Sequence, residues 1–429
     1  MSEKENMVSL EEEYASKPIP ENLRRHWKEP ASIYMGMTAV IACAMGGGSL
    51  ISGLSFSGAI AAFLIGLTIL VFLFYLPMGK IGAQEGLNTY LIGEAAFGKY
   101  GSSLATALVV TAIPCIGWYG IQVAIASQAI VGVFGWGENA LLIITAILGI
   151  IFAIPAMYGM LSMAWLNYAS IPVMFLIIAY GLVKSLGTVG LAGIMDYQPA
   201  QHMGLGWGIN LQIGMIAVGA AFAADYTRWI RNRWADVTLS GVVGLYPYTV
   251  VLTLAGMVMA ISAASLGVAQ PWNIVEVMIK LGLPSIALIL IFLLQWTTVI
   301  TAAYSSGLAL QKVFGWRRFW WTMVSAVFGI ALAVSGIVNH FIGFLMILAS
   351  WVTPAVAVVI TEYYFVAKGR FVPKPGIYWP GVIAWFIGGL VAWKSGTFGI
   401  PAINGMVAAG LVYGVVEAVK AGASKPVAR

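Results

Sequence analysis

The sequence predicts an all-α protein that crosses a lipid bilayer many times, and two observations lead to this fold class. Apolar residues occupy 60% of the 429 positions and charged residues only 9%, whereas a soluble domain has roughly a quarter charged residues. Twelve apolar segments are each long enough to cross a hydrocarbon core of roughly 30 Å as a tilted helix. Continuous runs of this length lack the alternation of a β-barrel strand, so helices are the expected spanning element.

The twelve expected helices form a single transmembrane domain over residues 32–420. A polar, acidic tail over 1–31 comes before them and a short tail over 421–429 comes after, and the chain start lacks the pattern of a cleavable signal peptide. In chain order, the expected helices cover residues 32–57, 58–82, 103–134, 139–158, 163–186, 208–231, 238–265, 284–312, 318–338, 340–366, 376–395 and 398–420.

The distribution of Lys and Arg predicts how these helices are oriented. With both termini cytoplasmic, 19 of the 22 basic residues fall in cytoplasmic tails and loops, and only Lys184, Lys280 and Lys394 fall outside. This bias is the positive-inside pattern of a multi-pass protein in the cell (cytoplasmic) membrane. Because the basic residues lie in short loops, the formal charge of +6 does not indicate a nucleic-acid partner. No obligate protein partner is evident either.

The first apolar segment, Ile33 to Phe56, contains Gly46-Gly47-Gly48-Ser49 near its middle. Three glycines in a row weaken a helix and favour unwound backbone. Lipid tolerates such backbone only where its freed polar groups face protein, ligand or water. We therefore expect a break near Gly46–Gly48 that forms part of a transporter binding site. The alternative is that small residues let neighbouring helices approach closely.

The sixth apolar segment is a second candidate for a break, because Gly214 and Gly219 lie among many alanines. Its start lies 176 positions after that of the first segment. Broken helices at matching positions in the two halves of a chain are typical of an inverted repeat. Close helix packing through small residues is again the alternative.

The middle of each expected helix lacks acidic and basic residues. Intramembrane charges usually mark proton relays or charged-ligand sites, so their absence favours an uncharged substrate. Asp225 and Glu362 lie toward cytoplasmic helix ends, beside Arg228 and Lys368, where an ion pair or loop anchor is expected. A sodium ion needs no such charge, because a hard cation accepts neutral oxygen ligands. Both cysteines lie within apolar segments, which indicates neither a disulfide nor a metal site.

A few polar side chains do occur at depth. Trp118 and Gln122 are four residues apart and share one helix face, where an indole and an amide suit a flat heterocycle. The alternative is a packing tryptophan with a glutamine bonded to a neighbouring helix. Thr297 and Thr298 follow Leu294 by three and four residues, so two hydroxyls can converge with a free carbonyl on one small ion. Threonines in membrane helices also bond back to their own backbone.

Several motifs spread over nearly the whole chain carry a resemblance to a known family: Gly53-Leu54-Ser55, Phe97-Gly98-Lys99-Tyr100-Gly101-Ser102, Ile116-Gly117-Trp118-Tyr119-Gly120, Ala224-Asp225-Tyr226-Thr227-Arg228 with Arg231-Asn232, and Trp296-Thr297-Thr298 followed by Tyr304-Ser305-Ser306-Gly307. With them the chain resembles the nucleobase:cation symporter-1 family, which includes cytosine, purine–cytosine, allantoin and hydantoin permeases. The resemblance implies a LeuT-like fold with inverted five-helix repeats over 32–186 and 208–366 and two further helices over 376–420. It also implies alternating-access uptake of a planar nitrogen heterocycle.

The resemblance implies functional residues as well. A sodium site would use two carbonyls of the first helix, and a carbonyl and two hydroxyls of the eighth, matching Gly36, Ala39, Leu294, Thr297 and Thr298. Trp118 matches the family's stacking tryptophan and Gln122 the glutamine of the hydantoin branch. With the glycines of the expected break, the predicted substrate site comprises Trp118, Gln122, Cys115, Met215, Ile216, Gly46 and Gly47.

The chain departs from the family pattern at three positions. Cys115 stands where cytosine permeases have a glutamine, Ile216 where a second aromatic stacks, and Ala303 where the hydantoin branch has an asparagine. These departures leave the identity of the substrate open.

The sequence thus predicts a secondary transporter that imports a neutral nucleobase-like ring, of cytosine, purine or pyrimidine type, with Na⁺ as the coupling ion. The alternatives within this class are a permease for allantoin, hydantoin or a hydroxymethyl-pyrimidine, and coupling to H⁺ in place of Na⁺. An uncoupled channel or facilitator is the alternative from another class. An enzyme is not expected, because the expected helices carry no His, Cys or acidic cluster at depth.

Overall fold

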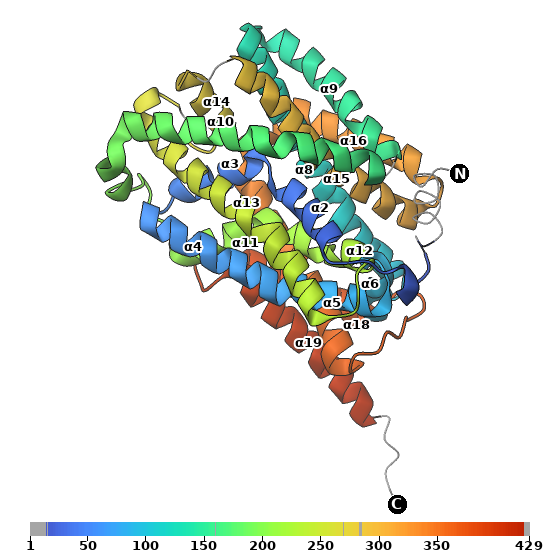
Figure 1. Ribbon diagram of the computed structural model, residues 1–429. Helices are drawn as coiled ribbons and strands as arrows, with labels where there is room; N and C mark the ends of the chain where they lie inside the picture. Colours follow the sequence, from blue (N-terminus) through green and yellow to red (C-terminus); the bar gives the residue numbers. More distant parts are fainter. Residues whose placement is uncertain (1–13, 15, 159, 269, 283–284, 424–429) are drawn as a thin grey trace, which may run out of the picture.

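The structure is a computed structural model that describes residues 14, 16–158, 160–268, 270–282 and 285–423. Apart from one isolated bridge between Arg25 and Ile230, the regular elements of these residues are helices (Figure 1). The predicted all-α architecture is therefore confirmed.

The first half of the chain forms α2 (Lys28–Thr38), α3 (Ile41–Ile51), α4 (Phe56–Ile69), α5 (Leu76–Glu85), α6 (Thr89–Phe97), α7 (Lys99–Ser102), α8 (Ile113–Phe134), α9 (Glu138–Tyr158) and α10 (Met160–Met195). The second half forms α11 (Leu205–Ala221), α12 (Ala223–Thr227), α13 (Trp234–Ala263), α14 (Ile274–Lys280), α15 (Ser285–Phe314), α16 (Arg318–Val334), α17 (Phe341–Ile360), α18 (Trp379–Lys394) and α19 (Pro401–Ala423). Three π-helical turns continue these helices without a gap, at Leu70–Tyr75, Ser103–Ala112 and Thr361–Val366.

Among the described residues, eight continuous helices are long and apolar enough to cross a membrane, and the bent pair α2–α3 makes a ninth span. The remaining expected spans, the eighth, ninth and eleventh, coincide with α15, α16 and α18, of which α16 and α18 are short at 17 and 16 residues. The total of twelve stays a prediction.

The first span is broken, but not where the glycines predicted. α2 ends at Thr38 and α3 begins at Ile41 after a bend of 57°. The prediction of a break near Gly46–Gly48 is wrong, because these glycines lie inside α3, where Gly47 packs closely against α13. A Cβ atom on Gly47 would lie 2.1 Å from the carbonyl oxygen of Thr253.

The sixth span shows the same correction. α11 runs unbroken through Gly214 and Gly219 and is interrupted only at Phe222, whose φ of −92° and ψ of 24° leave the helical region before α12 begins. A Cβ atom on Gly214 would lie 2.1 Å from the carbonyl oxygen of Leu345 on α17. The glycines are therefore contact points between helices, and the interruption lies one turn closer to the helix end.

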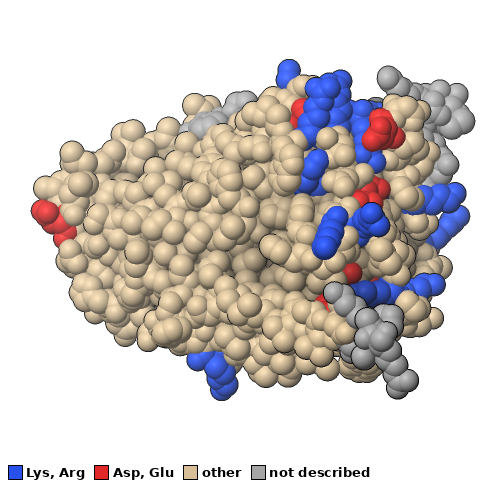
Figure 2. Space-filling view, turned by 90° about the horizontal axis from the view of Figure 1, so that it is seen from below, with Lys and Arg blue, Asp and Glu red and all other residues tan. Residues whose placement is uncertain are grey.

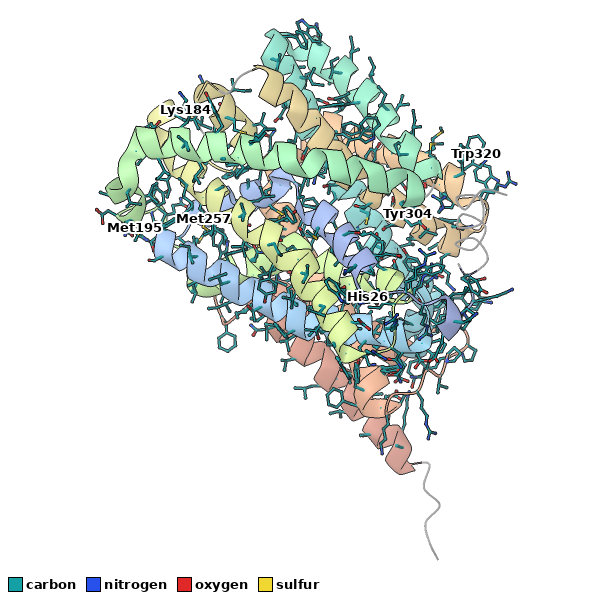
Figure 3. All side chains as sticks on the ribbon, in the orientation of Figure 1. His26, Lys184, Met195, Met257, Tyr304 and Trp320 are labelled. Atoms are coloured by element: carbon teal, nitrogen blue, oxygen red, sulfur yellow. The ribbon has the colours of Figure 1, made fainter. Side chains whose placement is uncertain are left out.

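Charged residues gather at one end of the molecule. Figure 2 shows Lys and Arg concentrated there over a surface that is otherwise mostly uncharged. In Figure 3, His26 and Trp320 lie toward that end and Lys184 lies at the opposite one. The separation follows the basic-loop pattern of the sequence.

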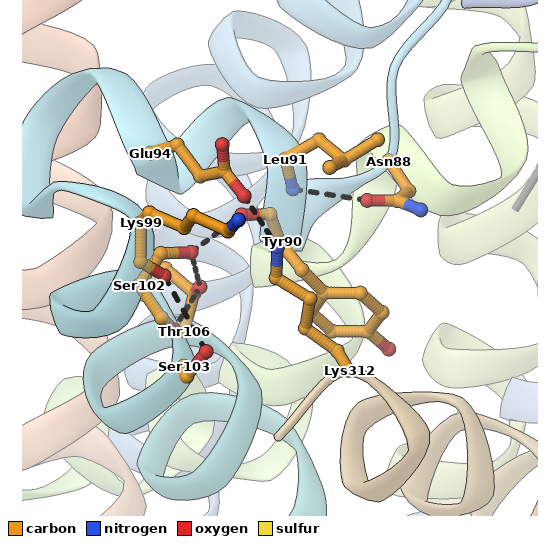
Figure 4. Close-up of polar contacts among 9 residues, drawn as sticks. All are labelled: Asn88, Tyr90, Leu91, Glu94, Lys99, Ser102, Ser103, Thr106 and Lys312. Atoms are coloured by element: carbon orange, nitrogen blue, oxygen red, sulfur yellow. Dashed lines mark hydrogen bonds and ion pairs between the residues drawn. The ribbon is translucent and has the colours of Figure 1, made fainter. Parts of the chain in front are cut away.

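Ion pairs and tyrosine hydroxyls tie the helices together at this basic end. Lys312 on α15 pairs with Glu94 on α6 (Figure 4). Lys374 pairs with Glu362 at 3.0 Å, and the Tyr413 hydroxyl of α19 donates to the same carboxylate at 2.7 Å. Glu362 therefore anchors α19 to the end of α17 through Tyr413. Its ion pair is with Lys374 and not with Lys368, the residue that the sequence suggested.

Candidate functional site

A cavity of about 70 Å³ lies where the bend of the first span meets α8, α11 and α15. Such a volume exceeds several times the roughly 10–15 Å³ that one water molecule needs. Most of its lining is apolar, and the described lining residues carry no formal charge: Met37, Thr38, Val40, Ala42, Cys43, Cys115, Trp118, Gln122, Met215, Ile216, Val218, Gly219, Phe222, Thr298, Thr301 and Ala302.

The bend redirects two backbone hydrogen bonds at the edge of this cavity. In a continuous helix the N–H of Val40 would pair with the Gly36 carbonyl, but it donates to the Thr38 carbonyl at 2.9 Å. In the same way the N–H of Cys43 would pair with the Ala39 carbonyl, but it donates to Val40 at 3.0 Å. The break thus releases from helical pairing the two carbonyls that the family resemblance assigned to a sodium ion.

α15 brings a hydroxyl to one of these carbonyls. The Thr298 hydroxyl donates to the Gly36 carbonyl at 3.4 Å, and Thr298 is buried. Leu294 and Thr297 lie on the same helix, but their side chains fall outside the described part of the chain. Carbonyl and hydroxyl oxygens without a carboxylate fit a hard monovalent cation. The described part of the predicted sodium site therefore has oxygen atoms that are suitable ligands for the ion.

Trp118 presents its indole ring to the cavity from α8. Its ring meets Phe341 edge to face at a centroid distance of 6.0 Å and Phe344 at 5.4 Å, with interplanar angles of 76° and 81°. Such edge contacts fix the plane of the indole while they leave ring surface to the cavity. A flat substrate can stack on that surface.

Gln122 lies one turn further along α8, buried to 1% exposure but lining the cavity. Its amide oxygen accepts a hydrogen bond of 2.5 Å from the amide nitrogen of Gln295 on α15, which is fully buried. The pair leaves the other end of the Gln122 amide for a ligand.

The remaining predicted substrate residues divide into two groups. Cys115, Met215 and Ile216 line the cavity. Gly46 and Gly47 are not among the lining residues. A Cβ atom on Gly46 would lie 3.4 Å from the sulfur of the lining residue Met215, and one on Gly47 would lie 2.1 Å from the Thr253 carbonyl oxygen.

Sequence reasoning missed several residues of this region, among them Phe222 and Gln295. Phe222 lines the cavity at the interruption between α11 and α12. It supplies an aromatic ring on the sixth span, where Ile216 stands at the position of the family's second stacking aromatic. Gln295 directly precedes the motif Trp296-Thr297-Thr298, but no sequence signal connected it with Gln122. A glutamine beside candidate ion ligands in an apolar helix was the only available signal.

Asp225 lies outside the cavity lining. Its carboxylate accepts a hydrogen bond of 2.8 Å from the backbone N–H of Thr89, at the start of α6. Arg228 donates to the Asp225 backbone carbonyl at 3.2 Å, a contact with the backbone and not with the carboxylate. Asp225 therefore anchors α12 to α6. Among the described residues, His, Cys, Asp and Glu form no group of three that could hold a metal ion.

Comparison with known sequences identifies the family to which the chain belongs. A sequence model described as a permease for cytosine/purines, uracil, thiamine and allantoin matches residues 18–416. The cytosine permease of Escherichia coli (strain K12) is 27% identical over 357 residues, which cover 83% of this chain and 82% of that protein. The hydantoin permease of Microbacterium maritypicum is 24% identical over 400 residues, covering 82% of this chain and 77% of that protein.

Solved structures show the same fold at lower identity. Mhp1, a nucleobase-cation-symport-1 family transporter in a closed conformation with bromovinylhydantoin bound, superposes with a TM-score of 0.80 at 19% identity and 95% coverage of both chains. A Na⁺-coupled sialic acid symporter in an outward-open state reaches 0.61 at 11% identity, covering 97% of this chain and 95% of that one. The predicted LeuT-like fold is confirmed, and the protein is a multi-pass membrane protein. The chain belongs to the family of permeases for cytosine and purines, uracil, thiamine and allantoin, and it is a transporter, not an enzyme.

Proposed function

We propose that the protein imports a neutral, planar nitrogen heterocycle of the nucleobase type by Na⁺ symport with alternating access. One observation carries this proposal: the bend between α2 and α3 opens released carbonyls beside the same cavity that Trp118 and Gln122 line. A substrate site and an ion site then share one broken helix, an arrangement that couples two ligands through a common element.

The chemistry of the cavity selects for the substrate class. A flat ring can stack on Trp118 and exchange a hydrogen bond with Gln122 while its edges meet Met215 and Ile216. A charged ligand would lose its hydration without a counter-charge, because the described lining residues carry none. The lining therefore favours an uncharged ring as the substrate.

For the ion, the proposed ligands are the carbonyl oxygens of Gly36, Ala39 and Leu294 and the hydroxyls of Thr297 and Thr298. A bound Na⁺ supplies a positive charge that joins α2 to α15. Thr298 already contacts the Gly36 carbonyl, so the two helices meet at this point. The hydroxyl that donates there can instead turn its oxygen to a cation.

We place the basic end of the molecule in the cytoplasm, with both termini, and the protein in the cell membrane. A series of contacts near the two ends of the described chain supports this placement: the N–H of Ile19 donates to Gly86, Glu85 accepts from Tyr363, and the neighbouring Glu362 accepts from Tyr413 of α19. We further propose inverted repeats over 32–186 and 208–366, with α18 and α19 as additional helices.

The relatives support two ring types. The similarity to the cytosine permease supports a nucleobase as the substrate. The similarity to the hydantoin permease and the presence of Gln122 in the cavity support a hydantoin or allantoin. Both types are small neutral nitrogen heterocycles with hydrogen-bonding groups along the edge of the ring.

Thermal stability of the purified protein tests the proposal. Cytosine, uracil, adenine, hypoxanthine, hydantoin and allantoin are added in NaCl and in choline chloride, because a ligand that binds the native state raises its melting temperature. We expect at least one ring to stabilise the protein, and to do so more in Na⁺. No stabilisation by any ring would overturn the substrate class. If the stabilisation is independent of Na⁺ but increases as the pH falls, the coupling ion is H⁺ and not Na⁺. If uptake into liposomes depends on neither ion gradient, the protein is a facilitator.

A further inference from the structure

The contact between Gln122 and Gln295 is a pair of buried primary amides of which only one reaches the cavity. Gln122 lines the cavity from α8, whereas Gln295 lies behind it on α15 and is absent from the lining. Their side chains are 1% and 0% exposed, and the amide nitrogen of Gln295 lies 2.5 Å from the amide oxygen of Gln122. The orientation of one amide therefore determines that of the other.

On the side of Gln295, the amide oxygen is buried and has no hydrogen-bond partner among the described residues, so none of them holds the pair in one orientation through that oxygen. A primary amide has a donor end and an acceptor end, so turning both amides by half a rotation keeps one hydrogen bond between them. In either arrangement one end of the Gln295 amide is unpaired, so a reversal breaks no further hydrogen bond of Gln295 among the described residues.

We propose that Gln295 is a specificity-determining positioning residue, which lets Gln122 present either an N–H donor or a carbonyl acceptor to the substrate ring. This inference rests on the proposed function and narrows its substrate class to rings that carry either an oxo or an amino group at the edge that Gln122 reads. In the arrangement of the structure, Gln122 turns its N–H groups toward a ring carbonyl. In the reversed arrangement, Gln122 turns its oxygen toward a ring amino group.

The physical reason is the penalty for an unpaired polar group. A site with a fixed donor can reject an analogue that lacks the matching acceptor by about 10⁴–10⁵-fold, because the buried donor is left without a partner. A reversible pair avoids that rejection, since the amides turn together while the hydrogen bond between them is kept. The cavity can then bind both members of an oxo/amino pair.

Two matched pairs of rings test this in the full-length protein. Cytosine and uracil differ by an amino against an oxo group, as do adenine and hypoxanthine, and their dissociation constants are measured in Na⁺ buffer. For the unaltered chain we expect the members of a pair to bind within about tenfold of each other. A preference above about a hundredfold within both pairs would overturn the inference.

Gln295→Glu is the informative variant. Burial favours the neutral form of a carboxyl at this position, so the variant is compared at a low pH, where the acid is neutral and can still donate, and at a high pH, where the ionised carboxylate only accepts. In the ionised form Gln122 must turn its N–H groups toward the carboxylate and its oxygen toward the ring. We expect the preference of the variant, and not of the unaltered chain, to shift by at least about tenfold toward cytosine and adenine as the pH rises. An unchanged ratio in a folded Gln295→Glu protein overturns the inference.

Gln295→Met keeps the test decisive if the glutamate variant does not fold, because Met fills a similar volume without a hydrogen bond. Loss of the partner should weaken both members of a pair equally, by about two- to tenfold. Unchanged affinities would make Gln295 a packing residue and overturn the inference. Gln212→Met is the matched control: Gln212 is equally buried, on α11, lies outside the cavity lining and should leave affinities and ratios unchanged. If the unaltered chain binds none of the four rings, hydantoin and allantoin are measured as well. Binding of neither means that the proposed function has failed, whereas binding of one of them with rejection of all four nucleobases overturns this inference alone.

Discussion

Thr298 and Gly36 lie 262 positions apart in the chain, and the hydroxyl of the first donates to the carbonyl of the second at 3.4 Å. The carbonyl accepts this bond because the bend after Thr38 has removed its helical donor. The contact therefore marks the point where an ion can join the first span to the eighth.

The first prediction concerns this junction. Replacing Thr297 and Thr298 together by Ala removes both proposed hydroxyl ligands and leaves Trp118 and Gln122 in place. Because coupling between two sites is reciprocal, substrate affinity in Na⁺ should fall by the coupling factor, typically about 5–150-fold, to the value measured in choline. The Ser double variant keeps the hydroxyls and should retain the Na⁺ dependence. Equal Na⁺ dependence in the Ala and unaltered proteins would contradict the assignment.

Trp118→Ala should weaken substrate binding at least about tenfold and leave the protein folded, since base stacking on an aromatic contributes roughly 1–3 kcal/mol. Trp118→Phe keeps a smaller ring for stacking and should lose less. Trp379→Ala is the control, because Trp379 is 61% exposed at the start of α18. Dissociation constants by calorimetry decide the matter, and equal values for all four proteins would reduce Trp118 to a packing residue.

Gln122→Leu should reduce uptake more than Cys115→Ala. Both residues line the cavity, but only the amide can pair with the polar edge of a ring, and an unpaired polar group in a dry site costs about 1–3 kcal/mol. Initial uptake rates at substrate concentrations below half-saturation give the comparison. If Cys115→Ala is the more damaging change, recognition is centred on position 115, where cytosine permeases have a glutamine.

Gly47→Ala should lower stability and not act first on the substrate. The added methyl group would lie 2.1 Å from the Thr253 carbonyl oxygen, so α3 and α13 must separate, and overpacking of this kind costs typically about 1–3 kcal/mol. The melting temperature should fall, whereas Gly137→Ala, which has open space around it, should leave it unchanged. If Gly47→Ala keeps the normal melting temperature but no longer binds the substrate, Gly47 belongs to the substrate site.

Much of the fold could be predicted from composition, because apolar length and basic loops follow directly from the physics of the bilayer. The positions of the breaks could not. Glycine favours both unwound backbone and close helix contact, and sequence alone does not separate the two uses. The bend instead lies at Ala39 and Val40, where the backbone leaves the helical region without a glycine.

The site divides in a similar way. Trp118 and Gln122 are recognisable because they share a face of one helix, four residues apart. The link between Gln122 and Gln295 spans 173 positions, and Phe222 reaches the cavity only because α11 stops beside it. Such contacts depend on how distant helices pack, which no local pattern reports.

The chain has two cysteines, Cys43 on α3 and Cys115 on α8, and both line the cavity. The native protein therefore contains its own chemical reporters at the substrate site. A small membrane-impermeant thiol reagent, added on one side of the membrane, can modify them only in conformations that open the cavity to that side, since the reaction needs access to the thiolate. The labelling rate from each side then measures how often the cavity faces outward or inward, without any cysteine being introduced, and a bound ring should slow it.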